Sequence, residues 1–217
     1  GGPGQFLEES QAMLAVGARP NARRCLVLGL GAGALLTTLQ TYLPEADLDC
    51  VEGRGSAKIV DKFFYPRFSE IGKSRLIEDD AVHFLRVAPG RYDIVFSRPA
   101  PPYDDPGASF FFTDDFYRLI AARLNADGTF VQRISFSMMG GAQRATVIKT
   151  FAGHFPFTSI YEIQPGHVVF IGRLAHLGQT AEQLIATIKA MGQSHAGMIH
   201  PVMNEFQFRS VSAHSST

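Results

Sequence analysis

The chain is poor in charged residues, and this shortage narrows the function classes to consider. Charged residues make up 18% of the 217 residues, and 20 Lys plus Arg balance 20 Asp plus Glu. A zero net charge without a basic block gives no reason to expect nucleic acid as a partner. The low charge fraction also leaves apolar surface, which is compatible with a homodimer.

Cysteines and long apolar runs are also scarce. Cys25 and Cys50 both fall in short apolar runs, where small buried side chains are expected. This usage favours a reducing, cytoplasmic location. No apolar run approaches the roughly 20 residues of a membrane span, and the N-terminus has neither the basic start nor the apolar block of a signal peptide. We therefore expect no membrane span in this chain.

Several catalytic and metal-binding patterns are missing as well. The seven histidines are scattered, and no Cys-x-x-Cys pair or nucleophile elbow occurs. We predict no metal site, and we expect the histidines to be surface or internally satisfied side chains. No internal repeat or low-complexity tract divides the chain.

What the chain does contain is an alternation of short apolar runs with helix-length periodic segments. The apolar runs predict strands over residues 25–28, 48–51, 75–78, 92–97, 129–134, 157–163 and 167–172. Helices are predicted over residues 6–16, 34–43, 57–64, 81–87, 113–124, 142–151 and 181–191. The turn Gln164-Pro165-Gly166 predicts an antiparallel hairpin. The prediction is an α/β fold, a doubly wound and mostly parallel seven-stranded sheet with a C-terminal antiparallel hairpin.

The same pattern predicts three parts. Residues 1–22 would form an N-terminal helix and linker, residues 23–191 a Rossmann-like nucleotide-binding domain, and residues 192–217 a C-terminal tail. The tail has no clear period, so we assign it no element.

The strongest local motif is a glycine turn between the first predicted central strand and its helix. Gly29, Gly31 and Gly33 occupy alternate positions there, which fits the dinucleotide-binding fingerprint. Glycines let a ligand approach the backbone, and the helix start offers unpaired N–H groups. The turn predicts a nucleotide cofactor; a tight turn without a ligand is the alternative.

Two acids follow the next two strands. Glu52 lies 23 positions after Gly29, where a carboxylate can accept hydrogen bonds from ribose hydroxyls. Asp80 follows the third strand, where it can accept from an adenine amine. The alternatives are an ordinary surface acid for Glu52 and a helix cap for Asp80.

Five segments resemble spermidine synthase and its relatives, within the wider class of S-adenosylmethionine-dependent methyltransferase folds. In order they are RPNARRCLVLGLGAG, DLDCVE, IEDDAVHFL, YDIVFS and FTDDFYRLIAARLNADGTFVQ, and the similarity covers roughly residues 11–173. The resemblance implies an S-adenosyl cofactor, either S-adenosylmethionine or its decarboxylated form. The implied cofactor-binding residues are Gly29, Gly31, Gly33, Glu52, Asp80, Ala81 and Ser97.

The chain departs from the aminopropyltransferase pattern at two places. Ala32 replaces an aspartate inside the glycine turn, and the aspartate-rich motif after the fourth strand becomes SRPAPP, which puts Ser97 and Arg98 in its place. Two like charges about 4 Å apart at an effective dielectric near 20 repel by on the order of 4 kcal/mol, so Arg98 disfavours a polyamine. Arg98 can instead pair with a carboxylate, so we expect S-adenosylmethionine to bind better than its decarboxylated form.

The proline-rich loop over residues 99–112 is predicted to be the acceptor lid. Arg98 and Tyr103 are the predicted substrate-binding residues, and Asp104 and Asp105 the predicted catalytic ones; a solvated loop is the alternative. We predict methyl transfer to a small-molecule acceptor, because that reaction needs in-line positioning more than a strong base. Three alternatives stay open: an inactive relative with a structural or regulatory role, an aminopropyltransferase with a rearranged acceptor site, and a nicotinamide-dependent dehydrogenase.

Overall fold

We describe the fold from a computed structural model of the chain, which covers residues 3–31, 33–53, 74–100, 103, 106–191 and 200–207. The predicted helix over residues 57–64 lies outside these ranges, as do Ala32, Asp104 and Asp105. Within them, no helix has both the length and the apolar character needed to cross a membrane.

A single sheet forms the centre of the molecule, with the strand order β3-β2-β1-β4-β5-β7-β6-β8. Its strands are β1 (Arg24–Leu28), β2 (Asp47–Glu52), β3 (Ser74–Glu78), β4 (Tyr92–Ser97), β5 (Leu124–Ser135), β6 (Phe157–Gln164), β7 (His167–Arg173) and β8 (His200–Gln207). The first five are parallel, and β7 is antiparallel to both β5 and β6. The predicted doubly wound α/β fold with its C-terminal hairpin is confirmed.

An eighth strand extends this sheet. β8 pairs antiparallel with β6, whereas the sequence analysis assigned no element after residue 191. Pairing with a sheet edge, which offers a row of free N–H and C=O groups, defines β8 better than any period in its own sequence does.

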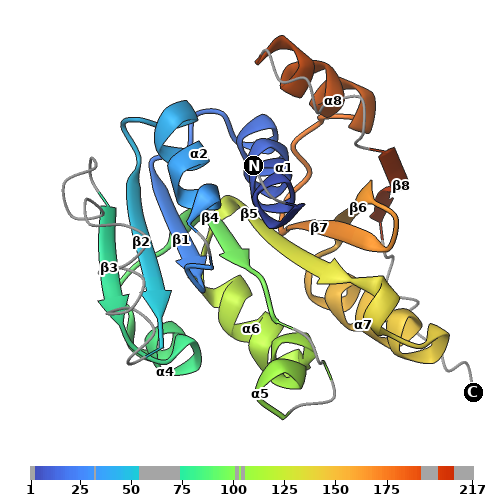
Figure 1. Cartoon of the computed structure of the whole chain (residues 1–217), viewed down its shortest axis with the longest axis horizontal. Coiled ribbons are helices and arrows are strands. Elements are labelled where there is room, and N and C mark those ends of the chain that lie inside the picture. The colour runs from blue at the N-terminus through green and yellow to red at the C-terminus, as the bar shows by residue number, and fades with distance from the viewer. Residues whose placement is uncertain are drawn as a thin grey trace, which may run out of the picture.

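Helices cover both faces of the sheet (Figure 1). Helices α1 (Pro3–Ala18), α2 (Ala34–Tyr42) and α8 (Ala181–Ala190) pack on one face, and α4 (Ala81–Val87), α6 (Asp114–Arg123) and α7 (Gly141–His154) on the other. Strand β1 lies between the two layers: Cys25 and Val27 join one core, and Leu26 and Leu28 the other. Burial on both faces explains its unbroken apolar sequence. Cys25 and Cys50 are buried, as predicted.

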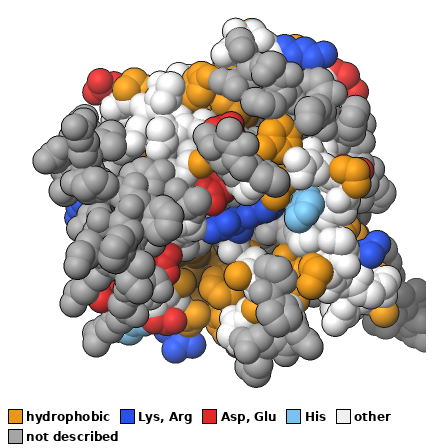
Figure 2. Space-filling view, viewed as in Figure 1, with side chains coloured by type: hydrophobic (Ala, Val, Ile, Leu, Met, Phe, Trp, Pro, Cys, Tyr) orange, Lys and Arg blue, Asp and Glu red, His pale blue; other side chains and the backbone are white. Residues whose placement is uncertain are grey.

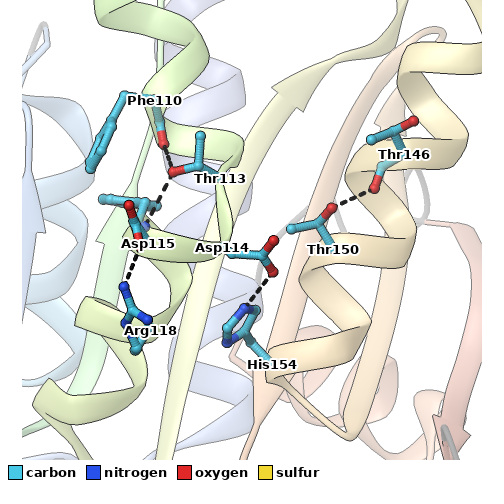
Figure 3. A network of polar contacts seen from close by, with 9 residues as sticks. Phe110, Thr113, Asp114, Asp115, Arg118, Thr146, Thr150 and His154 are labelled. Carbon is cyan, nitrogen blue, oxygen red and sulfur yellow. Dashed lines mark hydrogen bonds and ion pairs between the residues drawn. The ribbon is translucent and has the colours of Figure 1, made fainter.

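Helix α6 begins where the sequence predicts. The Thr113 hydroxyl accepts a hydrogen bond from the Phe116 N–H at 3.3 Å, an N-cap. Asp114 in the first turn pairs with His154 at the end of α7, with 2.9 Å between Oδ1 and Nε2. Figure 3 shows this pair linking α6 and α7. A second pair, Asp115–Arg118, lies within α6.

The loop after β4 is more ordered than its prolines predict. It contains a short helix α5 (Pro106–Ser109) and a 3-10 turn η2 (Phe110–Phe112). A proline is tolerated in the first turn of a helix because the N–H it lacks would be unpaired there. Pro106 therefore opens α5, although prolines argued against any helix in this loop.

The strand register aligns the carboxyl ends of the parallel strands. Leu28 pairs with both Val51 and Ser97, and Glu52 pairs with Glu78. The chain order reverses at β1, which lies between β2 and β4. In open α/β sheets, ligands bind in the crevice at the carboxyl ends next to such a reversal.

Candidate functional site

The glycine turn lies at this reversal point. Gly29, Gly31 and Gly33 have φ values of 91°, 58° and 80°, in the left-handed region that residues with a Cβ rarely adopt. The Gly29 N–H donates to the Val51 carbonyl at 2.9 Å, which ties the turn to the end of β2. The three predicted glycines therefore have the backbone that the turn requires.

Glu52 closes the turn from the neighbouring strand. Its Oε2 accepts a hydrogen bond from the Leu30 N–H at 2.7 Å, and its Oε1 accepts one from the Gly53 N–H at 3.0 Å. Each carboxylate oxygen can accept further bonds. Glu52 is thus held by the backbone beside the turn. Its contact with ribose hydroxyls stays a prediction.

Asp80 caps the next helix. Its Oδ1 accepts hydrogen bonds from the Val82 and His83 N–H groups, both at 2.9 Å, and Ala81 is the first residue of α4. The helix-capping role of Asp80 is therefore confirmed, and the two hydrogen bonds hold its carboxylate near the end of β3. An adenine contact through Oδ2 stays a prediction.

Buried polar atoms face the space between the glycine turn and β4. Ser97 is fully buried at the end of β4, and its Oγ has no hydrogen-bond partner; the same holds for Oε1 of Gln11 on α1. Both residues line a small cavity next to Gly29. Unpaired buried polar atoms are rare in native proteins and call for an explanation such as a ligand or ordered water.

Arg98 lines this space and forms an ion pair with Glu8 of α1. Its Nη1 lies 3.1 Å from Oε1 of Glu8, a carboxylate whose side chain is 3% exposed. The other oxygen of Glu8 accepts a hydrogen bond from the Leu35 N–H at 3.3 Å, at the start of α2. A Cβ on Gly31 would lie 1.9 Å from Nη2 of Arg98, so the guanidinium packs directly on the turn. The cavity left there measures only about 10 Å³.

The residues present fit an S-adenosyl group if Arg98 rotates. Glu52 and Asp80 present carboxylates at adjacent strand ends, the glycine turn removes side chains, and Ser97 and Gln11 offer unpaired polar atoms. The space beside Gly31 is the exception, since the Glu8–Arg98 pair occupies it. The Arg98 side chain is 30% exposed, so part of it already faces solvent.

A larger cavity lies on the other side of Arg98. Its volume is about 400 Å³, within the range of small-molecule sites. It is lined by Arg98, Pro99, Ala100, Tyr103, Arg133, Ile134, Ser135, Ser137, Met138 and His167. Figure 2 shows basic side chains in blue beside a histidine in pale blue near the middle of this face, with acidic side chains in red just above them.

Two structural features build this larger cavity. The antiparallel register of β5 and β7 places His167 opposite Ser135. Tyr103, from the loop after β4, closes the cavity: its hydroxyl oxygen accepts a hydrogen bond from the Ser135 N–H at 2.9 Å, and its ring packs edge-on against Phe112 with centroids 5.1 Å apart. The hairpin and the predicted lid loop therefore meet at the end of β5.

The titrating groups of this cavity have shifted pKa values. Burial, with a smaller contribution from Arg98, lowers the pKa of Arg133 to about 10. Burial and the Arg133 charge lower the pKa of His167 below its ordinary value. Burial raises the pKa of Tyr103, although the Ser135 N–H and the two arginines oppose the rise. At pH 7 the cavity therefore holds charged arginines and a neutral histidine.

The structure brings together the two predicted substrate-binding residues, Arg98 and Tyr103, in one cavity. Asp104 and Asp105 lie outside the described residues, so their predicted catalytic role stays a prediction. Glu8, Arg133 and His167 also lie at the site, although they were not predicted from the sequence. No local motif marks them, because helix packing and the hairpin bring them to the site. Among the described residues, no cluster of His, Cys, Asp and Glu is arranged to hold a metal ion.

The chain is similar in sequence to curated polyamine aminopropyltransferases. No protein-family model matches the chain. It is 27% identical over 168 residues to a polyamine aminopropyltransferase from Pyrobaculum calidifontis, and 27% identical over 146 residues to one from Pectobacterium atrosepticum. These alignments cover 73% and 65% of this chain but 57% and 50% of the relatives. The chain thus spans about half the length of the curated relatives that it matches.

Solved structures agree on the fold. Human methyltransferase-like protein 13 in complex with SAH matches with a TM-score of 0.68 at 17% identity, over 86% of this chain and 88% of that one. A spermidine synthase in complex with the transition state analogue AdoDATO matches with a TM-score of 0.67 at 14% identity, over 89% and 76%. The resemblance indicated by the sequence motifs is confirmed: the chain has a spermidine synthase-like fold of the class I S-adenosylmethionine-dependent type.

Proposed function

We propose that the protein binds S-adenosylmethionine and transfers its methyl group to a small acceptor. The observation that carries this proposal is the pairing of Arg98 with Glu8 against the glycine turn. The nucleoside would be held by Gly29, Glu52 and Asp80, with Ala81 and Ser97 beside them. When bound, the cofactor would supply an electrophilic methyl group on a sulfonium.

The Glu8–Arg98 pair suits the amino-acid end of the intact cofactor. That end is a zwitterion, whose ammonium matches a buried carboxylate and whose carboxylate matches a guanidinium. Insertion between Glu8 and Arg98 would replace one ion pair by two. The decarboxylated cofactor lacks the group that Arg98 would bind, so the pair favours S-adenosylmethionine.

Aminopropyl transfer is an alternative that the relatives' names support, since they are polyamine aminopropyltransferases. The charges of the described site oppose it. Arg98 and Arg133 both line the larger cavity, and a polycation placed there would meet two positive charges. Aminopropyl transfer would require Asp104 or Asp105 to supply a carboxylate for the amine.

An inactive relative is a second alternative with its own observation. The cavity of about 10 Å³ beside Gly29 has no room for an amino-acid moiety while Arg98 stays on Glu8. If that pair never opens, it acts as a permanent structural substitute for the ligand.

Thermal unfolding with added ligands tests these alternatives. We expect S-adenosylmethionine and S-adenosylhomocysteine to raise the melting temperature, because they bind the folded state. Glu52→Gln should weaken S-adenosylhomocysteine binding by about tenfold, through loss of a charged acceptor. Asp47→Asn, at the exposed start of the same strand, is the control and should leave it unchanged. No shift with either ligand would favour the inactive relative, and a shift with NAD alone would favour a dehydrogenase.

The cytoplasmic location, the homodimer and the lack of a nucleic-acid partner stay predictions from the sequence. Light scattering at several protein concentrations tests whether the protein is a homodimer.

A further inference from the structure

The larger cavity carries a positive charge that the described residues do not balance. Arg98 and Arg133 both reach it, and Glu8 is the carboxylate paired with Arg98. Two positive charges against one negative charge leave one positive charge over. His167 adds none at pH 7, because its pKa is lowered.

Arg133 feels the charge of Glu8, but Glu8 forms its ion pair with Arg98 and not with Arg133. Its Nε is buried without a hydrogen-bond partner, and it forms no ion pair within the described part of the chain. With a pKa lowered to about 10, it is still protonated at pH 7. An unpaired, partly buried guanidinium is unfavourable, and a carboxylate or phosphate relieves this because its oxygens match the planar fork of N–H groups.

The neutral groups around Arg133 can donate hydrogen bonds. The Tyr103 hydroxyl accepts from the Ser135 N–H, so its own hydrogen is left to donate. Ser135 and Ser137 share a hydrogen bond of 2.9 Å between their Oγ atoms, which uses one of their two hydroxyl hydrogens. Nδ1 of His167 is buried without a partner. These groups add donors beside the guanidinium and no carboxylate.

We propose that this cavity binds the oxyanion group of a small molecule, a carboxylate or a phosphate, with Arg133 as its main partner. This proposal rests on the proposed function, because the bound molecule would be the methyl acceptor. The cavity of about 400 Å³ holds a metabolite-sized ligand, and Pro99, Ile134 and Met138 give it an apolar wall for the rest of that ligand. The class of acceptor is therefore opposite in charge to a polyamine.

Calorimetry with four probes tests this assignment. The probes are 4-hydroxybenzoate for a carboxylate, phenyl phosphate for a phosphate, 4-hydroxybenzamide as the neutral control and putrescine as the dication. Each is titrated into the full chain with and without S-adenosylhomocysteine. We expect at least one anion to bind about tenfold or more tightly than the amide, and the tighter of the two identifies the oxyanion.

Variants locate the binding group. Arg133→Gln should weaken anion binding by about tenfold to a hundredfold, the effect of losing a charged hydrogen bond, while Arg133→Lys should retain part of the affinity. Arg86→Gln, an exposed arginine on α4, is the matched control and should change nothing. An unchanged circular dichroism spectrum in each variant shows that the fold is intact.

The proposal would be overturned by no preference for an anion over the amide, by no effect of Arg133→Gln, or by tighter binding of putrescine. The double variant Asp104→Asn/Asp105→Asn addresses two acids beside Tyr103 in the sequence. Anion affinity should stay equal or rise in it, and a loss would also count against the proposal. If S-adenosylhomocysteine binds and the anions do not, only this inference fails; if the anions bind and S-adenosylhomocysteine does not, only the proposed function fails.

Discussion

At the residue scale, Arg98 separates two spaces of the site. Its guanidinium pairs with Glu8 beside the glycine turn, and its side chain also lines the larger cavity next to Arg133. A single rotation of this side chain would open the first space and change the charge of the second. Cofactor binding and acceptor binding are therefore expected to be coupled through Arg98.

Gly31 offers a test of how closely Arg98 packs on the turn. Both Gly29 and Gly31 have positive φ, so alanine at either position strains the backbone by about 1–2 kcal/mol. A Cβ at Gly29 would meet nothing within 4 Å, whereas one at Gly31 would meet the ends of the Arg98 and Glu8 side chains, and moving them breaks their ion pair. Urea unfolding should therefore show a larger loss of stability for Gly31→Ala than for Gly29→Ala.

The same comparison in an Arg98→Ala background provides the control. The excess loss of Gly31→Ala should shrink there, because the main colliding group is gone. An excess that persists unchanged would mean that the arginine does not pack on the turn.

His167 predicts a pH dependence of stability. Its pKa is lowered in the folded state by burial and by Arg133, so the unfolded chain binds its proton more tightly. The stability from neutral His167 is present above the ordinary histidine pKa of about 6.5 and is lost as pH falls through the lower folded value. The stability of the wild type minus that of His167→Gln should fall between pH 7.5 and pH 5.5 in urea titrations.

Removing the Arg133 charge tests whether that charge helps to lower the pKa of His167. In the Arg133→Gln background this fall should be smaller. A difference between wild type and His167→Gln that is flat, or that grows at low pH, would contradict the assignment.

At the element scale, β7 packs tightly against the end of α7. A Cβ on Gly172 would lie 2.6 Å from Phe155 and 2.7 Å from Phe151. Gly172→Ala should therefore lower the free energy of unfolding by about 1–3 kcal/mol, the usual cost of overpacking a core.

Gly153→Ala is the matched control on α7 itself. Its Cβ would meet nothing within 4 Å, so the same substitution should stabilise the protein by about 0.4–1 kcal/mol. The two variants differ in sign, and equal effects in thermal or urea unfolding would refute this account of the packing.

The elements themselves follow the sequence closely wherever local chemistry defines them. Thr113 predicts the start of α6, and the apolar run around Leu26 predicts the buried strand β1. β8 shows the limit, since an edge strand depends on the neighbour it pairs with. Pro106 shows a second limit. The effect of a proline depends on its position within the helix, and Pro106 begins α5.

At the scale of the whole molecule, the site is only partly readable from the sequence. Gly29, Glu52 and Asp80 can be found because each lies at the end of a strand or within two residues after it, in a regular βαβ order. Glu8 and His167 cannot, because the packing of α1 and the β6–β7 hairpin bring them in from opposite ends of the chain. These two residues therefore reach the site only through the tertiary structure.

The most direct test of the account is calorimetry that compares S-adenosylmethionine with its decarboxylated form. We expect the intact cofactor to bind about tenfold or more tightly to the wild type, because its carboxylate gains a charged hydrogen bond from Arg98. Arg98→Gln should remove most of that preference, while Arg86→Gln should keep it. Equal affinities, or a preference for the decarboxylated form, would contradict the account.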